Sequence, residues 1–112
     1  MESRKESENK RPLLLAPAFQ DYIWGGERLK RDWGKQTKMT PLAESWELSC
    51  HEAGPSTIAG GAFRGRTLAQ YLASHPQDVG ERAEKAGEFP LLIKLIDAAG
   101  PLSVQVHPDD AY

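Results

Sequence analysis

The stretch of residues 89–110 reads FPLLIKLIDAAGPLSVQVHPDD and contains two strand-like segments joined by a turn. Its first part, 91–96, is an apolar run interrupted by Lys94, a pattern typical of a buried strand. After a turn at 99–101, residues 102–107 alternate strictly between apolar and polar side chains. This is the two-residue period of a strand with one buried face. The stretch therefore carries the strongest β signal in the chain and favours a mainly β fold.

The polar face of the second predicted strand is formed by Ser103, Gln105 and His107. Gln105 and His107 offer an amide oxygen and an imidazole nitrogen, and both groups are suitable zinc ligands. Two ligands do not fix a metal by themselves. Taken alone, the pair is more simply interpreted as the water-facing side of a half-exposed strand.

Three further residues stand out because their chemistry does not match their surroundings. Lys94 needs solvent, a carboxylate or an anionic ligand, since a buried unpaired ammonium group is costly; an edge-strand lysine that blocks aggregation is the simplest explanation. Glu44 shares one face of the predicted strand 42–50 with apolar residues, and an internal Lys94–Glu44 pair would explain both. Trp24 precedes a glycine turn, where core packing is the common role and ligand stacking the alternative.

The remaining segments predict short elements around this stretch. Residues 13–15 predict a short strand or an extended entry segment. Strands are expected at 42–50 and 56–59, and short helices near 27–33 and 67–75. Thr67 and Gln70 have the spacing of a capping box at the start of the second helix. Residues 1–11 are almost wholly polar and predict a disordered tail, because they bury too little apolar surface to offset the entropy of ordering.

The composition limits the possible partners and the location. The 112 residues carry 14 Lys and Arg against 16 Asp and Glu, for a net charge of −2, so no basic surface for nucleic acid is expected. One cysteine allows no intrachain disulfide, which fits the cytoplasm. The apolar segment 13–16 is too short for a membrane span. We therefore expect a cytoplasmic protein without nucleic-acid or membrane partners.

Three segments together resemble a known family. They are FPLLIKLIDAAGPLSVQVHPDD (89–110), YIWGG (22–26) and AESWELS (43–49). In this order they resemble the type I mannose-6-phosphate isomerases, most nearly the shorter bacterial form, from about residue 12 to residue 112. The resemblance implies a cupin fold, which is an antiparallel β-barrel or jelly roll that holds zinc. It also implies an enzyme that interconverts mannose 6-phosphate and fructose 6-phosphate.

The resemblance implies roles for individual residues. By position, Gln105 and His107 match the first two zinc ligands, and the other two, a Glu and a His, would lie beyond residue 112. Ser103 and Lys94 match residues that line the sugar-phosphate site. Glu44 and Trp24 match other residues of the pocket. No residue matches the catalytic base, which stays unassigned.

Proteins of this family are much longer than 112 residues. We therefore expect residues 12–112 to be the N-terminal part of an incomplete barrel, and this part to be inactive alone. The alternative is a non-catalytic cupin relative that binds a sugar phosphate. Presence or absence of the downstream Glu and His would distinguish the two hypotheses. The sequence leaves the oligomeric state open.

Overall fold

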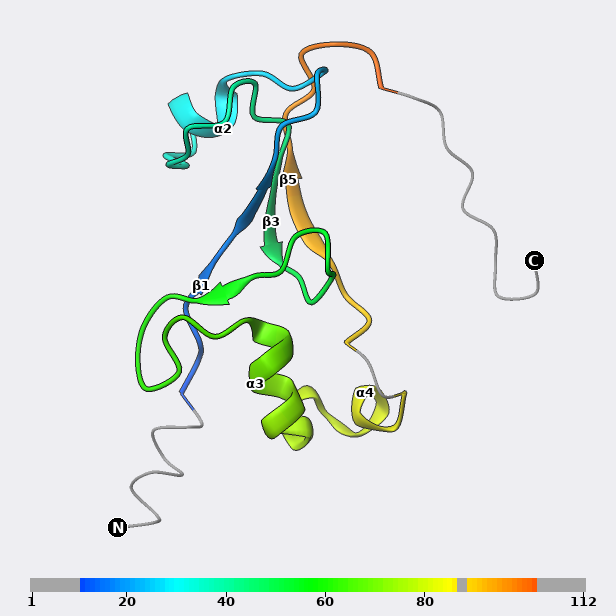
Figure 1. Cartoon of the computed structure of the whole chain (residues 1–112). Coiled ribbons are helices and arrows are strands. Elements are labelled where there is room, and N and C mark those ends of the chain that lie inside the picture. The colour runs from blue at the N-terminus through cyan, green and yellow to red at the C-terminus, as the bar shows by residue number, and fades with distance from the viewer. Residues whose placement is uncertain (1–10, 87–88, 103–112) are drawn as a thin grey trace, which may run out of the picture. The chain divides into compact units, whose positions relative to one another are not determined.

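The computed structural model describes residues 11–86 and 89–102 (Figure 1). The chain divides into two compact units. The first consists of Met1–Ala18 and Trp46–Lys94, and the second of Phe19–Ser45 and Leu95–Tyr112. Two small sheets and several short helices make up the described residues, in agreement with the expected mainly β class. The predicted strand 102–107 lies almost entirely outside the described residues.

The first unit contains a two-stranded antiparallel sheet. Strand β1 (Leu15–Ala16) pairs with β4 (Thr57–Ile58), so that Leu15 lies opposite Ile58. Ile58 is buried with 2% exposure and anchors this sheet in the core. The strand expected at 13–15 therefore exists but begins at Leu15, because the position of β4 determines which residues are paired. The strand expected at 56–59 is confirmed as β4.

A capped helix follows this sheet in the first unit. Helix α3 (Leu68–Ser74) begins after Thr67, whose hydroxyl oxygen accepts from the Gln70 backbone N–H at 3.0 Å. In return, the Thr67 N–H donates to the Gln70 side-chain oxygen at 3.0 Å. Each side chain thus satisfies a backbone donor that the helix leaves unpaired, and the predicted capping box is confirmed.

Two shorter helical segments continue the chain after α3 (Figure 1). Pro76 stands at the start of the 3-10 helix η1 (Pro76–Val79), and α4 (Glu81–Ala86) follows Gly80. Gly80 has φ +87°, a conformation that favours glycine and separates the two segments. Because the residue before a proline disfavours the helical conformation, Pro76 explains why α3 ends at Ser74.

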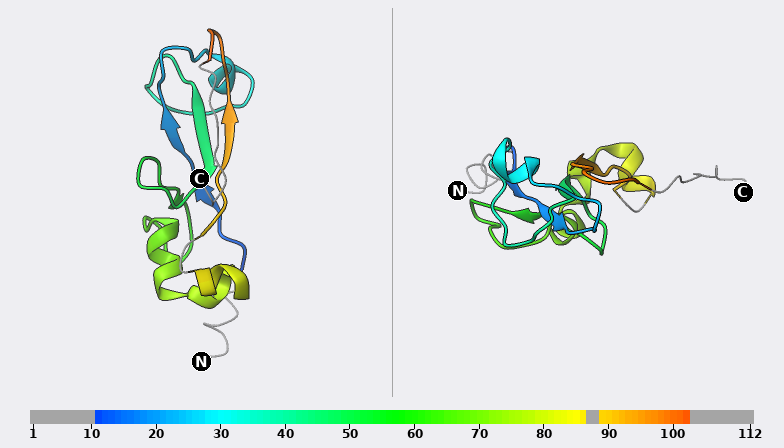
Figure 2. Two further views of the ribbon diagram at one scale, coloured as in Figure 1. Left: turned by 90° about the vertical axis from the view of Figure 1, so that its right-hand side faces the viewer. Right: turned by 90° about the horizontal axis from the view of Figure 1, so that it is seen from above.

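A three-stranded sheet has the order β2-β3-β5, formed by Ala18–Gln20, Glu44–Leu48 and Ile93–Ile96. The arrow of β3 points opposite to those of its two neighbours (Figure 2). The first half of β3 is buried on both faces, since Glu44, Ser45 and Trp46 are exposed by 6%, 0% and 6%. The sequence predicted one apolar face for this strand, but the structure covers both.

The second unit also contains the short helix α2 (Arg28–Arg31). Leu29 fixes it to the core with 3% exposure, and Gly34 follows with φ +67°. The helix expected at 27–33 is thus confirmed, although it covers fewer residues. Leu29 is the only buried residue of this helix, and tertiary packing supplies most of the stability of short helices. Little packing is therefore available to stabilise a longer helix here.

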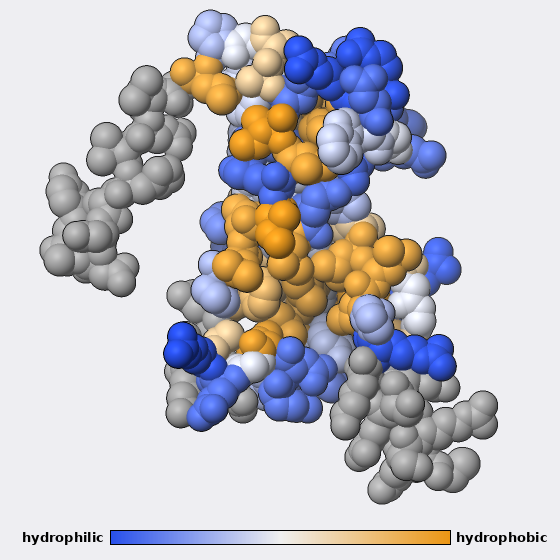
Figure 3. All heavy atoms as spheres, turned by 180° about the vertical axis from the view of Figure 1, so that it is seen from behind, coloured by the Kyte–Doolittle hydropathy of each residue, from blue (hydrophilic) through white to orange (hydrophobic). Residues whose placement is uncertain are grey.

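The apolar run 91–96 differs from its predicted environment. Leu91, Ile93 and Ile96 are exposed by 58%, 52% and 51%, so the expectation of a buried strand is wrong within the described residues. The reason is the place of β5, which lies at the edge of the sheet that the described residues form. Hydrophobic residues accordingly reach the surface on the face shown in Figure 3.

Candidate functional site

Strand β5 presents Lys94 at the surface of the first unit. The Lys94 ammonium lies 5.4 Å from the centroid of the Trp46 ring, which is within the range of a cation–π interaction. Trp46 is itself buried and meets the His51 ring edge-on, with 5.7 Å between the centroids. The structure therefore holds an exposed cation over a fixed aromatic face. This geometry is compatible with the edge-strand interpretation of Lys94.

Glu44 begins β3 and is a buried carboxylate with 6% exposure. Buried polar groups need partners, because an unsatisfied one loses its hydration without compensation. Across the part of the chain that is described, no buried side-chain nitrogen or oxygen lacks a hydrogen bond. Glu44 is thus held within a satisfied environment in the second unit. Its predicted pairing with Lys94 stays a prediction.

Trp24 lies in the second unit at the start of the glycine pair that the sequence singled out. Its side chain is half-buried and packs against Tyr22, with 5.5 Å between the ring centroids. Its carbonyl oxygen accepts from the Ala99 N–H at 2.7 Å and from the Gly100 N–H at 2.9 Å. Trp24 is therefore bound through its backbone to residues 99–100, which directly precede the segment with Ser103, Gln105 and His107.

Sequence reasoning missed Asp97, the residue immediately after β5. Its carboxylate is buried with 5% exposure and accepts from the Arg28 backbone N–H at 2.8 Å. The Arg28 guanidinium lies 3.7 Å from the same carboxylate. The only signal in the sequence is an acidic residue at the end of an apolar run. That signal names no partner, because Arg28 lies 69 residues away along the chain.

The predicted zinc ligands Gln105 and His107, together with Ser103, lie outside the described residues. Within residues 11–86 and 89–102, no group of three or more His, Cys, Asp and Glu side chains could hold a metal ion. No helix in those ranges is long and apolar enough to cross a membrane. Zinc binding by this chain thus stays an expectation from the sequence.

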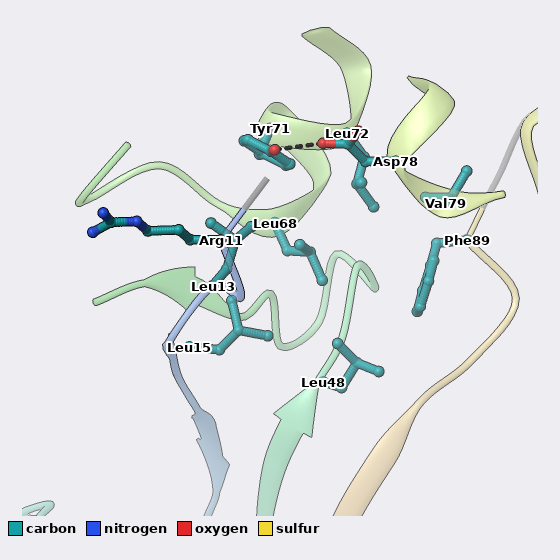
Figure 4. Close-up of a pocket in the computed structure, with 10 residues that line it drawn as sticks. All are labelled: Arg11, Leu13, Leu15, Leu48, Leu68, Tyr71, Leu72, Asp78, Val79 and Phe89. Carbon is teal, nitrogen blue, oxygen red and sulfur yellow. Dashed lines mark hydrogen bonds between the residues drawn. The ribbon is translucent and has the colours of Figure 1, made fainter. Parts of the chain in front are cut away.

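A pocket of about 410 Å³ opens in the first unit (Figure 4). Leucines and Phe89 form most of its wall, and Tyr71 donates a hydrogen bond to Asp78 beside it. Burial, with a smaller contribution from this hydrogen bond, raises the pKa of Tyr71 to about 12. Among the described residues, none that the sequence assigns to the sugar-phosphate or zinc site lines it, so this pocket is not the candidate site.

Comparison with known proteins identifies the family. Residues 13–112 match the family model of the phosphomannose isomerase type I catalytic domain. The chain belongs to this family. The mannose-6-phosphate isomerase resemblance seen in the three sequence segments is thereby confirmed.

The relatives extend this result and define how much of the family fold is represented. "Probable mannose-6-phosphate isomerase GmuF" of Bacillus subtilis is 43% identical over 101 residues, which cover 90% of this chain and 31% of the relative. The crystal structure of the mannose 6-phosphate isomerase from Bacillus subtilis matches with a TM-score of 0.71 and 36% identity, over 80% of this chain and 28% of that one. The chain thus spans about a third of the length of these relatives.

A further solved structure bears on the metal. It is a mannose 6-phosphate isomerase bound with zinc and yttrium, with a TM-score of 0.65 and 32% identity. The match covers 84% of this chain and 24% of that protein. Zinc is therefore present in one solved mannose 6-phosphate isomerase to which this chain is similar.

Proposed function

We propose that the intact protein is a zinc-dependent isomerase that interconverts mannose 6-phosphate and fructose 6-phosphate. The observation that carries the proposal is the match of residues 13–112 to the type I phosphomannose isomerase catalytic domain. Relatives named as mannose-6-phosphate isomerases support the choice of substrate. Residues 12–112 would form the N-terminal part of a cupin-type barrel and would be inactive alone, since they span about a third of these relatives.

The substrate phosphate is assigned to Lys94 and Ser103. A dianionic phosphate binds most strongly to charged donors, and a lysine ammonium supplies one. Support comes from the exposed position of Lys94, whose ammonium lies 5.4 Å from the centroid of the Trp46 ring. The Ser103 hydroxyl would add a neutral hydrogen bond. Glu44 and Trp24 would line the rest of the sugar pocket.

Zinc is assigned to Gln105 and His107, with a Glu and a second His from beyond residue 112 of the intact protein completing the shell. An amide oxygen and an imidazole nitrogen suit this metal, and a zinc-bound relative supports the assignment. When bound, zinc would polarise a sugar oxygen. The isomerisation itself transfers a proton between C2 and C1 through an enediol, which requires a base that none of the present assignments supplies.

Metal removal tests this proposal in the intact protein. We expect conversion of mannose 6-phosphate to be lost after treatment with a chelator and to return when zinc is added. Unchanged activity in the metal-free protein would contradict the role of zinc. A protein that binds mannose 6-phosphate without converting it, with or without zinc, would instead support the sugar-phosphate-binding alternative.

The ligand assignment has a separate test. His107→Ala is expected to lower the zinc content of the purified protein, because it removes an imidazole ligand. His75→Ala is the matched control, since His75 is half-buried and its ring Nδ1 donates to the Tyr71 carbonyl oxygen at 3.1 Å. Full zinc occupancy in His107→Ala would remove His107 from the metal shell.

We also propose a cytoplasmic location and a small-molecule partner only. The single cysteine, Cys50, requires no oxidising compartment for a disulfide within the chain. The net charge of −2 gives no electrostatic attraction to nucleic acid or to an acidic membrane surface.

A further inference from the structure

We propose that Asp97 is a positioning residue that fixes the Trp24 turn, defined as residues 22–28, against the segment leading to Ser103, Gln105 and His107. The inference rests on the proposed function, because Trp24 is assigned there to the sugar pocket. Asp97 itself is not expected to touch the substrate. It would act through the backbone of the turn, and all its contacts described below lie within the second unit.

The carboxylate of Asp97 is the centre of this arrangement. It is buried with 5% exposure, while its partner Arg28 has a side chain exposed by 70%. The Arg28 backbone N–H donates to Oδ2 at 2.8 Å, and Nε lies 3.7 Å from Oδ1. A buried carboxylate is costly unless it is hydrogen-bonded. Its burial at this point is therefore explained by the backbone donor and the nearby positive charge.

The glycine pair of the turn fits closely around this carboxylate. A Cβ atom at Gly26 would come within 2.6 Å of Asp97 Oδ2, and one at Gly25 within 2.6 Å of the Ala43 backbone. Real side chains do not approach so closely. The absence of side chains at Gly25 and Gly26 thus lets the turn approach Asp97 on one side and β3's flanking residue Ala43 on the other.

Backbone hydrogen bonds continue the contact on both sides of Asp97. Its own N–H donates to the Ala43 carbonyl at 2.8 Å. The N–H groups of Ala99 and Gly100 donate to the Trp24 carbonyl at 2.7 and 2.9 Å. Gly25 also forms an antiparallel bridge with Ala98. Residues 97–100 therefore hold the turn at both of its ends, and Asp97 supplies the side-chain contact.

The consequence for function follows from the next residues of the chain. Residue 100 is three positions before Ser103 and five before Gln105. Because the Trp24 turn is hydrogen-bonded to residues 97–100, the position of Trp24 is fixed relative to Gly100, from which the chain continues to Ser103. Loss of these contacts would make the position of Trp24 in the proposed sugar pocket less defined. We expect this to weaken substrate binding, seen in KM, more than it slows the chemical step, seen in kcat.

Amide hydrogen exchange in the intact protein tests the contact directly. In Asp97→Ala the Arg28 amide loses its acceptor, and we expect the Ala99 and Gly100 amides to exchange about tenfold faster or more. Asp97→Asn keeps a side-chain oxygen at this position, so protection at Ala99 and Gly100 should stay within about threefold of the wild type. The Gln70 amide, capped by Thr67 in the first unit, serves as an internal reference.

Steady-state kinetics provides the readout that a purely structural role would not move. We expect Asp97→Ala to raise KM for mannose 6-phosphate about tenfold or more and to change kcat less than about threefold, with partial restoration in Asp97→Asn. Asp32→Ala is the matched control. Asp32 is an exposed carboxylate that pairs with Arg31 at 3.0 Å in the same unit, and its removal should leave KM unchanged.

Gly26→Ala disturbs the same contact from the side of the turn. This second variant keeps the proposal testable if Asp97→Ala fails to fold. The new Cβ must displace the carboxylate, so this variant should speed exchange at Arg28 and raise KM. Normal KM and normal protection at Ala99 and Gly100 in Asp97→Ala, or in Gly26→Ala if the former does not fold, would overturn the proposal. A fall in kcat at unchanged KM would do the same.

The two proposals fail in different ways. If the wild-type protein does not isomerise mannose 6-phosphate, the proposed function is wrong. The amide exchange rates at Ala99 and Gly100 then test by themselves whether Asp97 holds the Trp24 turn. If the wild type is active and Asp97→Ala matches it in KM and exchange, only the positioning role of Asp97 is wrong.

Discussion

At the scale of single residues, Lys94 and Trp46 form a pair whose function can be separated from stability. Lys94→Ala in the intact protein should raise KM for mannose 6-phosphate about tenfold or more, because a charge-assisted hydrogen bond to phosphate is lost. Zinc content should be unchanged. Lys38→Ala, at another exposed lysine, is the control and should leave KM unaffected. An unaltered KM in Lys94→Ala would contradict its assignment to the phosphate.

Trp46 should influence the KM for mannose 6-phosphate indirectly, through its contact with Lys94. Its ring lies 5.4 Å from the Lys94 ammonium, and such contacts contribute roughly 0.5–2 kcal/mol. We expect Trp46→Leu to raise KM less than Lys94→Ala does, and Trp46→Phe to restore part of the loss because an aromatic face remains. Steady-state kinetics on variants that retain the wild-type circular dichroism spectrum would measure this. Equal KM values for the Leu and Phe variants would show that the ring does not orient Lys94.

Tyr71 predicts a dependence of stability on alkaline pH. Burial raises the pKa of its phenol from 10.0 to about 12. Below about pH 10 the phenol is protonated in both folded and unfolded chains, so its full contribution is present. As the pH rises from about 10 to about 12, the unfolded chain loses this proton first, and the free energy of unfolding falls.

Tyr71→Phe should remove this part of the alkaline loss. Urea denaturation from neutral pH to about pH 11 would show a flatter profile for Tyr71→Phe than for the wild type. Tyr22→Phe is the control, since Tyr22 is exposed by 43% and its profile should follow that of the wild type. A Tyr71→Phe profile as steep as the wild type would assign the alkaline loss to other groups.

The sequence identified Lys94 as exceptional because an ammonium group among apolar residues is visible without knowledge of the fold. Its exposure over Trp46 was not predictable, since that contact joins β5 to β3. Asp97 was missed for a related reason. Its role depends on Gly26 and Arg28, and the hydrogen bond to Arg28 crosses 69 positions in the chain. Chemistry can be recognised locally, whereas a partner is determined by the tertiary fold.

At the scale of elements, the cap of α3 makes the clearest prediction. Thr67→Ala removes the oxygen that accepts from the Gln70 N–H and should lower the free energy of unfolding by about 1 kcal/mol. Ser74→Ala is the matched control, because Ser74 lies exposed in the same helix and makes only a 3.5 Å contact with the Gln70 carbonyl. Chemical denaturation of both variants measures the difference. A loss in Ser74→Ala equal to that in Thr67→Ala would show that the cap is not responsible.

Elements governed by local signals were predicted well. The start of α3 depends on Thr67 and Gln70, which are three positions apart. The end of α2 is followed by Gly34, which adopts φ +67°. Strands were predicted less well, because their extent depends on a partner. β1 begins at Leu15 where it meets Ile58, and no property of residues 13–15 alone specifies that register.

At the scale of the whole molecule, the exposed apolar residues distinguish this chain from an ordinary small protein. Leu91, Leu92 and Ile93 of the first unit are exposed by 58%, 41% and 52%. Exposed apolar side chains are characteristic of sites that bind another surface or cause aggregation. Lys94 interrupts this run, and a charge on an edge strand opposes edge-to-edge association. The 112-residue chain is therefore expected to bind a hydrophobic dye such as ANS.

Polar substitutions on β5 test whether its apolar side chains are exposed to solvent or buried in the core. Ile93→Thr and Ile96→Thr should each lower ANS binding by the 112-residue chain and change the free energy of unfolding by less than about 0.5 kcal/mol, because both side chains are half-exposed already. Threonine also keeps the β-branch that strands favour. Ile58→Ala is the comparison, since Ile58 is 2% exposed and its truncation should cost roughly 2–5 kcal/mol. If the β5 variants lose as much stability as Ile58→Ala, residues 93 and 96 are buried in solution, and the original expectation of a buried strand would be restored.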